Sequence, residues 1–503
     1  MLASRLHIYW ARVVIELPQG AALGSGDFHD TEDMPFVVDA NGLPTLPGAG
    51  IAGALHSALR TLEVFDVEKL GVLFGALAGG DPKLSELAID FGYLHNQSDQ
   101  PVSGLVSTAA IAGDPVLMLC KKGITRQHAP HNHEGVAADG GLHNRQHLPA
   151  GARFTLELRL ECSEANLSVL EKIIQTMCHP LFRLGGGKNS GIGAVKVVRC
   201  SLKYFDLTKR CQLKAWMNWP KSIDSAVAVD KCDKFALAAP VLSHVHQLTL
   251  TLPMQSYWCI GGGANDACLK SVNEASNSEN IKTHPLVEQA INWAKKADKQ
   301  GEVGSVVKNV VVPGSSIKGV LAHQMAFEVR ARRNPITDEN PDARPAELIK
   351  LLGSASTATA AKTEAQANNA QAQNAPEGAV GRFWLQDLLI PIDTIKACFM
   401  TYNVIDQLSK GVVSGGLFTE KVCLPHVLNM TGYCAGPMEG SDADMVALNA
   451  SLAMLCDGRL AIGNHSAAGH GFAEGGTATW EPPVEIAEIA TPVVTQEALE
   501  AAR

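Results

Sequence analysis

The chain has 503 residues, more than one ordinary hydrophobic core accommodates, so at least two domains are expected. Its formal net charge of −9 argues against nucleic-acid binding over the whole surface, and any such binding needs a local groove. Twelve cysteines occur without a CxxC pair, which disfavours a zinc ribbon or a disulfide framework and fits a reducing compartment. No apolar run reaches about 18 residues and the first residues lack a signal-peptide pattern, so we expect a cytoplasmic protein without a membrane partner.

The first part of the chain alternates strands, turns and helices. His7–Leu17 has the apolar alternation of a strand and is followed by a glycine-rich turn and an acidic loop that contains Asp33. A Pro-Gly turn then opens a helix at Leu46–Leu55, and Leu87–Phe91 predicts the next strand, with Asp90 in it. These segments predict a strand, a loop, a helix and a strand in succession.

A polar segment and a glycine loop complete this first part. Residues 123–149 are rich in His, Gly and Asn and predict a protruding hairpin, on which Arg126 is expected to be exposed to a phosphate or simply to solvent. The histidines of this segment match no tight zinc spacing, so a solvated loop is the preferred interpretation. A strand and a helix follow, and then a glycine loop runs from Arg183 to Gly193 into the strand at 194–198.

The same landmarks recur after an irregular connector at 202–240. A second Pro-Gly turn at Pro313-Gly314 opens a helix, with Ser315 or Ser316 expected as its cap and Lys318 in its first turn. A strand carries Asp387 as the counterpart of Asp90, and a late glycine loop beginning at Arg459 echoes the one beginning at Arg183. Landmarks repeated in the same order indicate a duplication.

The order of elements in each half predicts an α+β fold of two tandem ferredoxin-like repeats, each with a protruding hairpin. We expect the following division: 1–201 as the first repeat, 202–240 as a connector, 241–480 as the second repeat, and 481–503 as a tail. An insertion near 354–377, made mostly of Ala, Thr, Gln and Asn, has little to bury and predicts disorder.

The paired Pro-Gly helices, the Gly-Gly-Leu-Phe segment ending in Leu424-Pro425 and the late glycine loops resemble the RAMP superfamily of CRISPR-associated proteins. More narrowly, the chain resembles two fused backbone subunits of a type III effector complex. The resemblance implies RRM-like repeats stacked along a guide RNA, with hairpins acting as thumbs that displace bases. It also implies guide RNA, target RNA and other type III subunits as partners.

The glycine loops carry the chemistry of this role, because their backbone amides can approach phosphates and lysines add charge. A tight turn that needs positive φ is the competing interpretation. The residues implied in RNA contact are Arg126; Gly186, Gly187, Lys188, Asn189, Ser190 and Gly191; Ser315, Ser316 and Lys318; and Asn464, His465 and Ser466.

The resemblance further implies that an aspartate shortly before the Pro-Gly turn cleaves the target RNA. Glu32-Asp33-Met34-Pro35 stands in that place, so Asp33 is the expected catalytic residue and the ligand of a divalent metal, Mg²⁺ or Mn²⁺. A merely solvated acidic loop is the alternative. The second half has no such stretch and is expected not to cleave.

Three functions remain open from the sequence. The first is a guide-RNA-binding backbone subunit with metal-dependent endoribonuclease activity in its first repeat. The second is a backbone subunit whose carboxylates are inert. The third is a guide-processing nuclease, in which His29 or His56 would have to act as general base.

Overall fold

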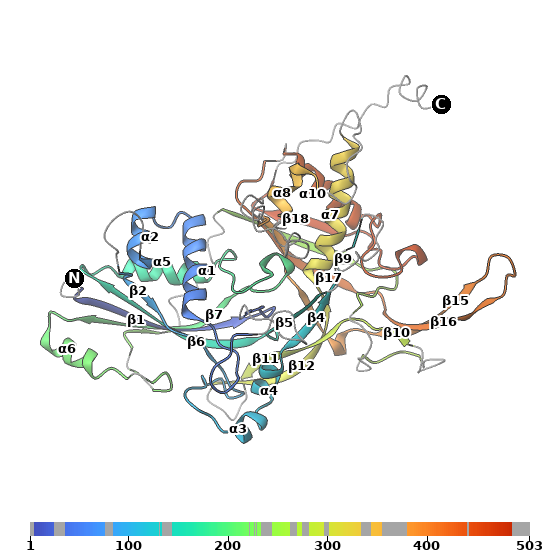
Figure 1. Ribbon diagram of the computed structural model, residues 1–503. Helices are drawn as coiled ribbons and strands as arrows, with labels where there is room; N and C mark the ends of the chain where they lie inside the picture. Colours follow the sequence, from blue (N-terminus) through green and yellow to red (C-terminus); the bar gives the residue numbers. More distant parts are fainter. Residues whose placement is uncertain are drawn as a thin grey trace, which may run out of the picture.

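The fold is known from a computed structural model and is mixed α+β, with two sheets that each carry helices (Figure 1). The structure describes residues 5–24, 36–75, 84–129, 131–132, 143–220, 222–225, 227, 229–232, 244–261, 269–273, 281–295, 301–332, 344–354, 380–439 and 442–484.

The first sheet is antiparallel and is built around the long, almost fully buried strand β1, whose run of β-branched and aromatic residues suits a central strand. Its partners come from three separate parts of the first half of the chain. In spatial order it contains β2 (Leu87–Ile89), β6 (Ala152–Cys162), β1 (His7–Leu17), β7 (Lys196–Asp206) and β8 (Lys231–Cys232), and the short β3 (Tyr93–Leu94) also pairs with β6.

Helices cover both faces of this sheet. The main core lies beneath α1 (Gly48–Thr61), α2 (Val67–Phe74) and α5 (Leu167–Met177) on one face. On the other face, α6 (Arg210–Met217) and the residues after it bring two tryptophans against Phe205: the Trp216 and Trp219 rings lie 5.1 and 5.0 Å from its ring centroid. The segment expected as an irregular connector therefore covers the outer face of the sheet.

The second sheet has the same strand order relative to its helices. It contains β13 (Phe383–Leu385), β17 (Val427–Ala435), β9 (Val245–Pro253) and β18 (Thr477–Glu481), packed against α7 (Gly314–Ala331), α8 (Ala346–Leu352) and α10 (Ala443–Cys456). Both sheets are built in the same order along the chain. After the central strand, β1 or β9, come helices and then an edge strand, β2 or β13, which pairs with β6 or β17. A helix, α5 or α10, then precedes the strand on the other side of the centre, β7 or β18. The expected α+β class is confirmed, whereas two tandem ferredoxin-like repeats and the division at 201, 240 and 480 stay predictions.

Smaller sheets project from these two layers. They are the hairpin β4 (Ile124–His128) and β5 (His143–His147); the group β10 (Ile281–Thr283), β16 (Val412–Cys423) and β15 (Ala397–Ile405); and the group β11 (Val287–Lys295), β12 (Glu302–Val312) and β14 (Leu388–Pro391). Two further helices, α3 (Thr108–Ala112) and α4 (Pro115–Lys122), precede β4. The hairpin β15–β16 extends away from the body, whereas β4–β5 lies against the second half (Figure 1).

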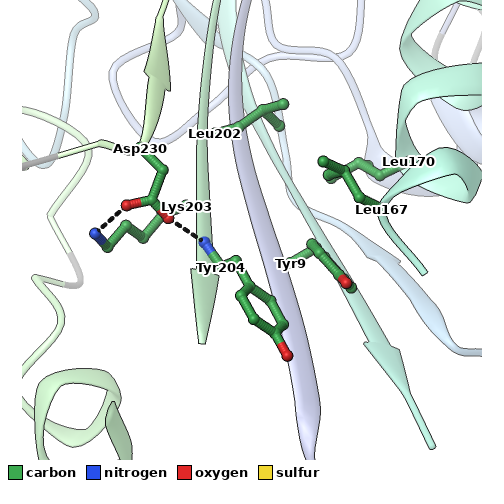
Figure 2. Close-up of a pocket in the computed structure, with 7 residues that line it drawn as sticks. All are labelled: Tyr9, Leu167, Leu170, Leu202, Lys203, Tyr204 and Asp230. Carbon is green, nitrogen blue, oxygen red and sulfur yellow. Dashed lines mark hydrogen bonds and ion pairs between the residues drawn. The ribbon is translucent and has the colours of Figure 1, made fainter. Parts of the chain in front are cut away.

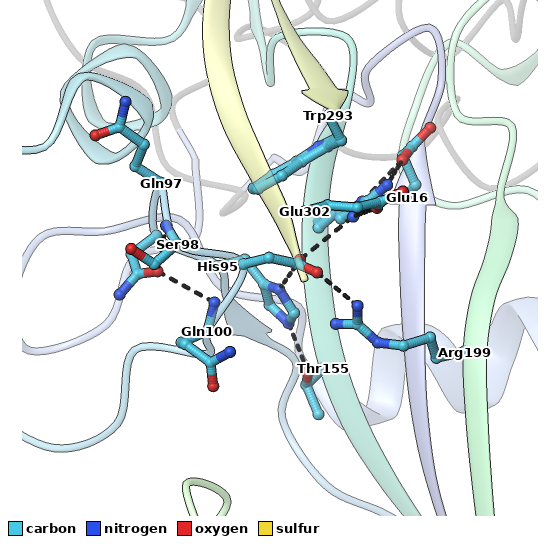
Figure 3. Close-up of polar contacts among 12 residues, drawn as sticks. Glu16, His95, Gln97, Ser98, Gln100, Thr155, Arg199, Trp293 and Glu302 are labelled. Atoms are coloured by element: carbon cyan, nitrogen blue, oxygen red, sulfur yellow. Dashed lines mark hydrogen bonds and ion pairs between the residues drawn. The ribbon is translucent and has the colours of Figure 1, made fainter. Parts of the chain in front are cut away.

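A buried polar network joins β11–β12 to the first sheet (Figure 3). Arg153 of β6 bridges Glu16 and Glu302 at 2.7 and 2.6 Å, and its guanidinium lies 4.5 Å from the centroid of the Trp293 ring. The Trp293 indole donates to the Gly151 carbonyl at 2.7 Å. Charged groups buried in this way fix the orientation of two elements because each loses much if its partner moves. No helix in the described part of the chain combines the length and apolar character that a membrane crossing requires.

Candidate functional site

The first turn of α7 is held by a carboxylate from another part of the second half. The helix begins at Gly314 with Pro313 as its N-cap, and neither Ser315 nor Ser316 makes a side-chain cap hydrogen bond, so the expected serine cap is wrong. Instead, the Gly314 amide donates to Asp387 Oδ1 at 2.9 Å. Asp387 satisfies one of the free amides that a helix start leaves.

The sequence suggested that Asp387 is the counterpart of Asp90, but the structure shows that it is not. A Cβ on Gly48 would face the Ile89 carbonyl, and one on Gly314 would face the Leu385 carbonyl, so the two turns contact the last residue of β2 and of β13. Asp90 thus corresponds to Gln386, and Asp387 corresponds to Phe91. The shift of one residue is invisible in the sequence because both segments contain an aspartate near the same place.

The first glycine loop docks onto this helix start from the first half. The Asp387 amide donates to the Gly191 carbonyl at 3.2 Å, and Asn189 Nδ2 donates to the Gly381 carbonyl at 2.9 Å. Gly191 has φ 101° and a Cβ there would lie 1.9 Å from Asp387 Oδ1, so only glycine permits this approach. The structure therefore brings the predicted loop, Gly186 to Gly191, beside the predicted residues Ser315, Ser316 and Lys318.

Cations from both halves gather at this contact, and we call Arg183, Lys188, Lys318 and Arg344 the junction cations. Arg183 is only 4% exposed, and its Nε and Nη1 atoms have no hydrogen-bond partner. Its Nη2 atom donates to the Ile192 carbonyl at 2.5 Å, and Lys318 Nζ donates to the Phe383 carbonyl at 2.7 Å. Within the described residues, none of the four forms an ion pair with a carboxylate.

The electrostatics of the junction cations favour a bound anion. Burial, followed by the charges of Arg344 and Arg183, lowers the pKa of Lys318 to about 8. Burial and then Arg183 also lower the pKa of Lys188. Burial also lowers the pKa of Arg183, although the charge of Asp387 opposes this. Buried cations whose charges disfavour one another mark a functional-site candidate, because a bound anion would relieve the repulsion.

Arg126 does not lie on an exposed surface, so its expected exposure is wrong, and its contact with a phosphate stays a prediction. It is 6% exposed and spans the two halves, donating to Glu288 at 2.8 Å and to Asp387 at 2.7 Å. Burial opposes its charge, but Asp387 and Glu288 more than offset this and raise its pKa. For Glu288, burial alone would raise the pKa, yet Arg126 and His147 lower it to about 2. Arg126 is part of the joint between the halves.

The second glycine loop, with Asn464, His465 and Ser466, lies at the root of β15–β16. His465 Nε2 is 2.6 Å from Glu420 Oε2, and the His465 ring stacks on Tyr402 with centroids 5.2 Å apart. The bridges Arg183–Ala194 and Ala461–Phe472 align the two loops, so Arg459, which pairs with Asp457, is not the counterpart of Arg183. His465 takes the place of Gly187, and Ser466 takes that of Lys188.

The expected catalytic residue, Asp33, lies outside the described residues, as does His29. Its role and its metal stay predictions, and the described residues contain no group of three or more His, Cys, Asp or Glu that could hold a metal ion. His56 packs edge-on against Phe74 with ring centroids 5.2 Å apart. That contact gives His56 a place in the packing of α1 and α2.

Two other polar groupings are not open sites. Thr155, His95 and Asp99 are linked at 2.6 and 2.8 Å in the order of a hydrolytic triad (Figure 3), but they are 2%, 1% and 3% exposed. A substrate has no access to them. The pocket in Figure 2 lies between β7 and α5, and its charges are satisfied: Lys203 pairs with Asp230 at 2.5 Å.

Sequence reasoning missed several residues of these clusters. Arg183 was noticed only as the start of a loop, and Arg344 follows a segment with no motif. Tyr402 and Glu420 come from a hairpin whose pairing with the glycine loop leaves no signal in the sequence. Arg183 could have been predicted as a member of the site, because it stands at the start of the glycine loop and, like Lys188 within the loop, carries a positive charge.

A cation-rich contact between a glycine loop and a helix start has the chemistry that an anion-binding site needs. Residues 19–196 match the family model of the RAMP superfamily. This match covers most of the first sheet with its helices, and it supports a RAMP-family CRISPR-associated protein. No curated protein matches the sequence.

Proposed function

We propose that the chain is a guide-RNA-binding backbone subunit of a type III CRISPR effector complex, working with target RNA and other effector subunits. The observation that carries the proposal is the set of junction cations. Arg183 and Lys188 come from the first half, and Lys318 and Arg344 come from the second. A phosphate bound among them would add negative charge beside cations on which Asp387 acts only through Arg183 in the described part of the chain.

The path of the RNA follows from which surfaces remain accessible. An RRM commonly stacks bases on the outer face of its sheet, but α6, Trp216 and Trp219 cover that face of the first sheet. The glycine loop remains, with Gly186 exposed and Lys188 half-buried beside it. RNA would run over the loops at the contact between the halves, where phosphates meet backbone amides and the junction cations.

The shared strand order of the two sheets supports two tandem ferredoxin-like, RRM-like repeats. Both sheets place the central strand between the third and fourth strands of the unit and cover it with helices from two places in the chain, before the second strand and before the fourth. A chain with two such repeats has two glycine loops, and each could contact a different part of one RNA strand. That arrangement suits a subunit lying along a guide more than an enzyme with a single pocket.

We also propose that Asp33 cleaves the target RNA with a divalent metal, Mg²⁺ or Mn²⁺. The segment that contains it leaves the body at Gly24 and returns at Phe36, which form a bridge. A Cβ on Gly123 would lie 2.7 Å from the Phe36 ring, which places the return at the root of β4–β5. Asp33 precedes Phe36 by three residues in the sequence, which supports a role for its carboxylate beside the hairpin. A carboxylate there could hold a metal against a bent RNA backbone.

The phosphate site is tested by Lys318→Met. Met keeps the length of the side chain and removes its charge, so affinity for a single-stranded RNA should fall and the slope of log affinity against log salt should decrease by about one. Lys214→Met, on α6 and exposed, is the matched control and should leave the slope unchanged. An unchanged slope for Lys318→Met would refute the phosphate site.

A further inference from the structure

The second glycine loop cannot hold a phosphate in the way proposed for the first. Ala461 stands where the first loop has Arg183, and Ser466 stands where it has Lys188. The nearest charged pair, His465 with Glu420, brings one acidic group for its one basic group. What this loop offers to RNA must therefore be something other than positive charge.

Three near-parallel aromatic rings lie at this place. Tyr402 of β15 and Phe418 of β16 are directly paired across the hairpin, with ring centroids 5.4 Å apart and planes 26° apart. The His465 ring lies 5.2 Å from Tyr402 and 6.4 Å from Phe418, at 6° and 26°. We call Tyr402, Phe418 and His465 the ring cluster. Both Tyr402 and Phe418 are half-buried, and His465 is 28% exposed.

A buried carboxylate sets the orientation of the histidine ring. Glu420 is 4% exposed, and its Oε2 atom lies 2.6 Å from His465 Nε2. On the other side, the Tyr402 hydroxyl lies 3.2 Å from His470 Nε2. Each of these two rings therefore has a polar contact that restricts it, and a restricted ring loses little entropy when another flat group stacks on it.

The backbone at His465 has a conformation that few residues other than glycine adopt. Its φ is 60°, in the left-handed region, whereas the first loop has glycine at the same place, Gly187 with φ 67°. A side chain kept in a strained conformation points to a role for that side chain. The loop is also open: a Cβ on Gly469 would meet nothing within 4 Å, so a large flat group can come close to the backbone.

We propose that the ring cluster stacks an unpaired nucleobase of single-stranded RNA at the root of β15–β16. The proposal rests on the proposed function, since it assumes RNA running along the chain, and adds a second kind of contact to it. The first loop would hold the strand through its phosphates and the second through a base. Base–aromatic stacking needs no sequence recognition, because every base has a π-face.

The test uses the full-length chain and unpaired RNAs that carry one 2-aminopurine at successive positions. Stacking should quench the fluorescence of the probe at one position. His465→Asn is the test variant, because asparagine tolerates positive φ and keeps an N–H donor near Glu420 while removing the ring. It should weaken binding roughly 5- to 150-fold and abolish the quench, with an unchanged salt slope. Tyr402→Ala should act in the same way.

Leu417→Ala is the matched control, because Leu417 lies next to Phe418 on β16, is 45% exposed and is not part of the ring cluster, so quench and affinity should persist. The proposal is overturned if His465→Asn and Tyr402→Ala, both folded by thermal unfolding, retain the quench and the affinity. A fall in salt slope for these variants would also overturn it, since the loop would then bind phosphate. RNA binding that Lys318→Met weakens but the ring variants do not would leave the proposed function intact, whereas a wild-type chain that binds no RNA refutes both.

Discussion

The two glycine loops share a backbone and differ in what surrounds it. Gly185 and Gly463 both approach the carbonyl of the preceding glycine turn, and each loop continues through a left-handed residue into a short 3₁₀ turn, η2 (Lys188–Ser190) and η6 (Ser466–Ala468). The first loop is pressed against the second half and is cationic. The second contacts a hairpin of its own half and is aromatic. One backbone frame thus supports two different chemistries, decided by the side chains brought to it.

The two Pro-Gly helices differ in a similar way. At α7, Asp387 accepts the first amide, and Arg126 and the first glycine loop cover it. At α1 the equivalent residue is Phe91, which is 55% exposed, and Ala52 replaces Lys318. The Pro-Gly turn is therefore buried in the contact between the halves at α7, whereas the equivalent turn at α1 has an exposed neighbour. The comparison gives four predictions about which half does what.

The largest expected effect concerns cleavage, which we assign to the first half alone. Asp33→Ala should reduce one cut of the target RNA by about 10²–10⁴-fold, because it removes the group that neutralises charge beside the attacked phosphate. Target binding and assembly should be unchanged. The measurement is a cleavage gel with the assembled complex, with and without chelator.

The second half has an aspartate, Asp266, that stands too far before its Pro-Gly turn to take the place of Asp33. Asp266→Ala is therefore the matched variant and should leave every fragment in place. If Asp33→Ala still produces all fragments, the catalytic assignment fails and the chain is a non-catalytic backbone subunit. If Asp266→Ala abolishes the cut instead, cleavage belongs to the second half and not to the first.

The next effect concerns the joint that only the first hairpin makes. Arg126→Met leaves Asp387 and Glu288 buried without their cation, which commonly costs about 3–5 kcal/mol. The halves should separate more readily, seen as a lower unfolding temperature and faster proteolysis between them. Adding Asp387→Asn and Glu288→Gln should restore most of the loss. A single Arg126→Met variant as stable as the wild type would show that the pair does not hold the joint.

Much of the fold was predictable from the sequence, because it rests on local signals. The Pro-Gly turns, the apolar periodicity of α1 and α7 and the alternation of β1 gave the right elements and the right α+β class. The protruding β15–β16 hairpin also agrees with the expectation. These features depend on residues close together in the chain, where turn chemistry and periodicity act directly.

The site was less predictable, because its decisive contacts join distant residues. Arg126 was expected to be exposed, since nothing in a polar hairpin shows that Glu288 and Asp387 lie 162 and 261 residues further on. The serine cap was expected by local rule, but a carboxylate 73 residues away took its place. Tertiary partners override local preference where a charge can be buried with its counter-charge.

A smaller effect tests the charge difference between the loops. Lys188→Ser gives the first loop the residue that the second has at Ser466. RNA affinity should fall by less than about tenfold, because the other junction cations remain, and the salt slope should decrease by about one. The reciprocal Ser466→Lys should increase the slope if the second loop lies beside the strand. Should Lys188→Ser leave both quantities unchanged, the first loop is a structural turn.

The smallest effect is a pH dependence confined to the second helix start. The pKa of Lys318 is lowered from 10.5 to about 8, chiefly by burial, so between these values the unfolded chain binds more protons than the folded one. The RNA-free chain should therefore gain stability as pH rises from about 8 towards 10. RNA affinity should fall in the lower part of this window, by no more than about fourfold between pH 7 and pH 8.5, because RNA must restore the proton. Lys318→Met, compared with the wild type at each pH in thermal unfolding and RNA titration, should remove this part of both dependences. Identical pH profiles for the two proteins would mean that Lys318 keeps an ordinary pKa. In that case burial and the charges of Arg344 and Arg183 would not act on Lys318 as strongly as the structure indicates.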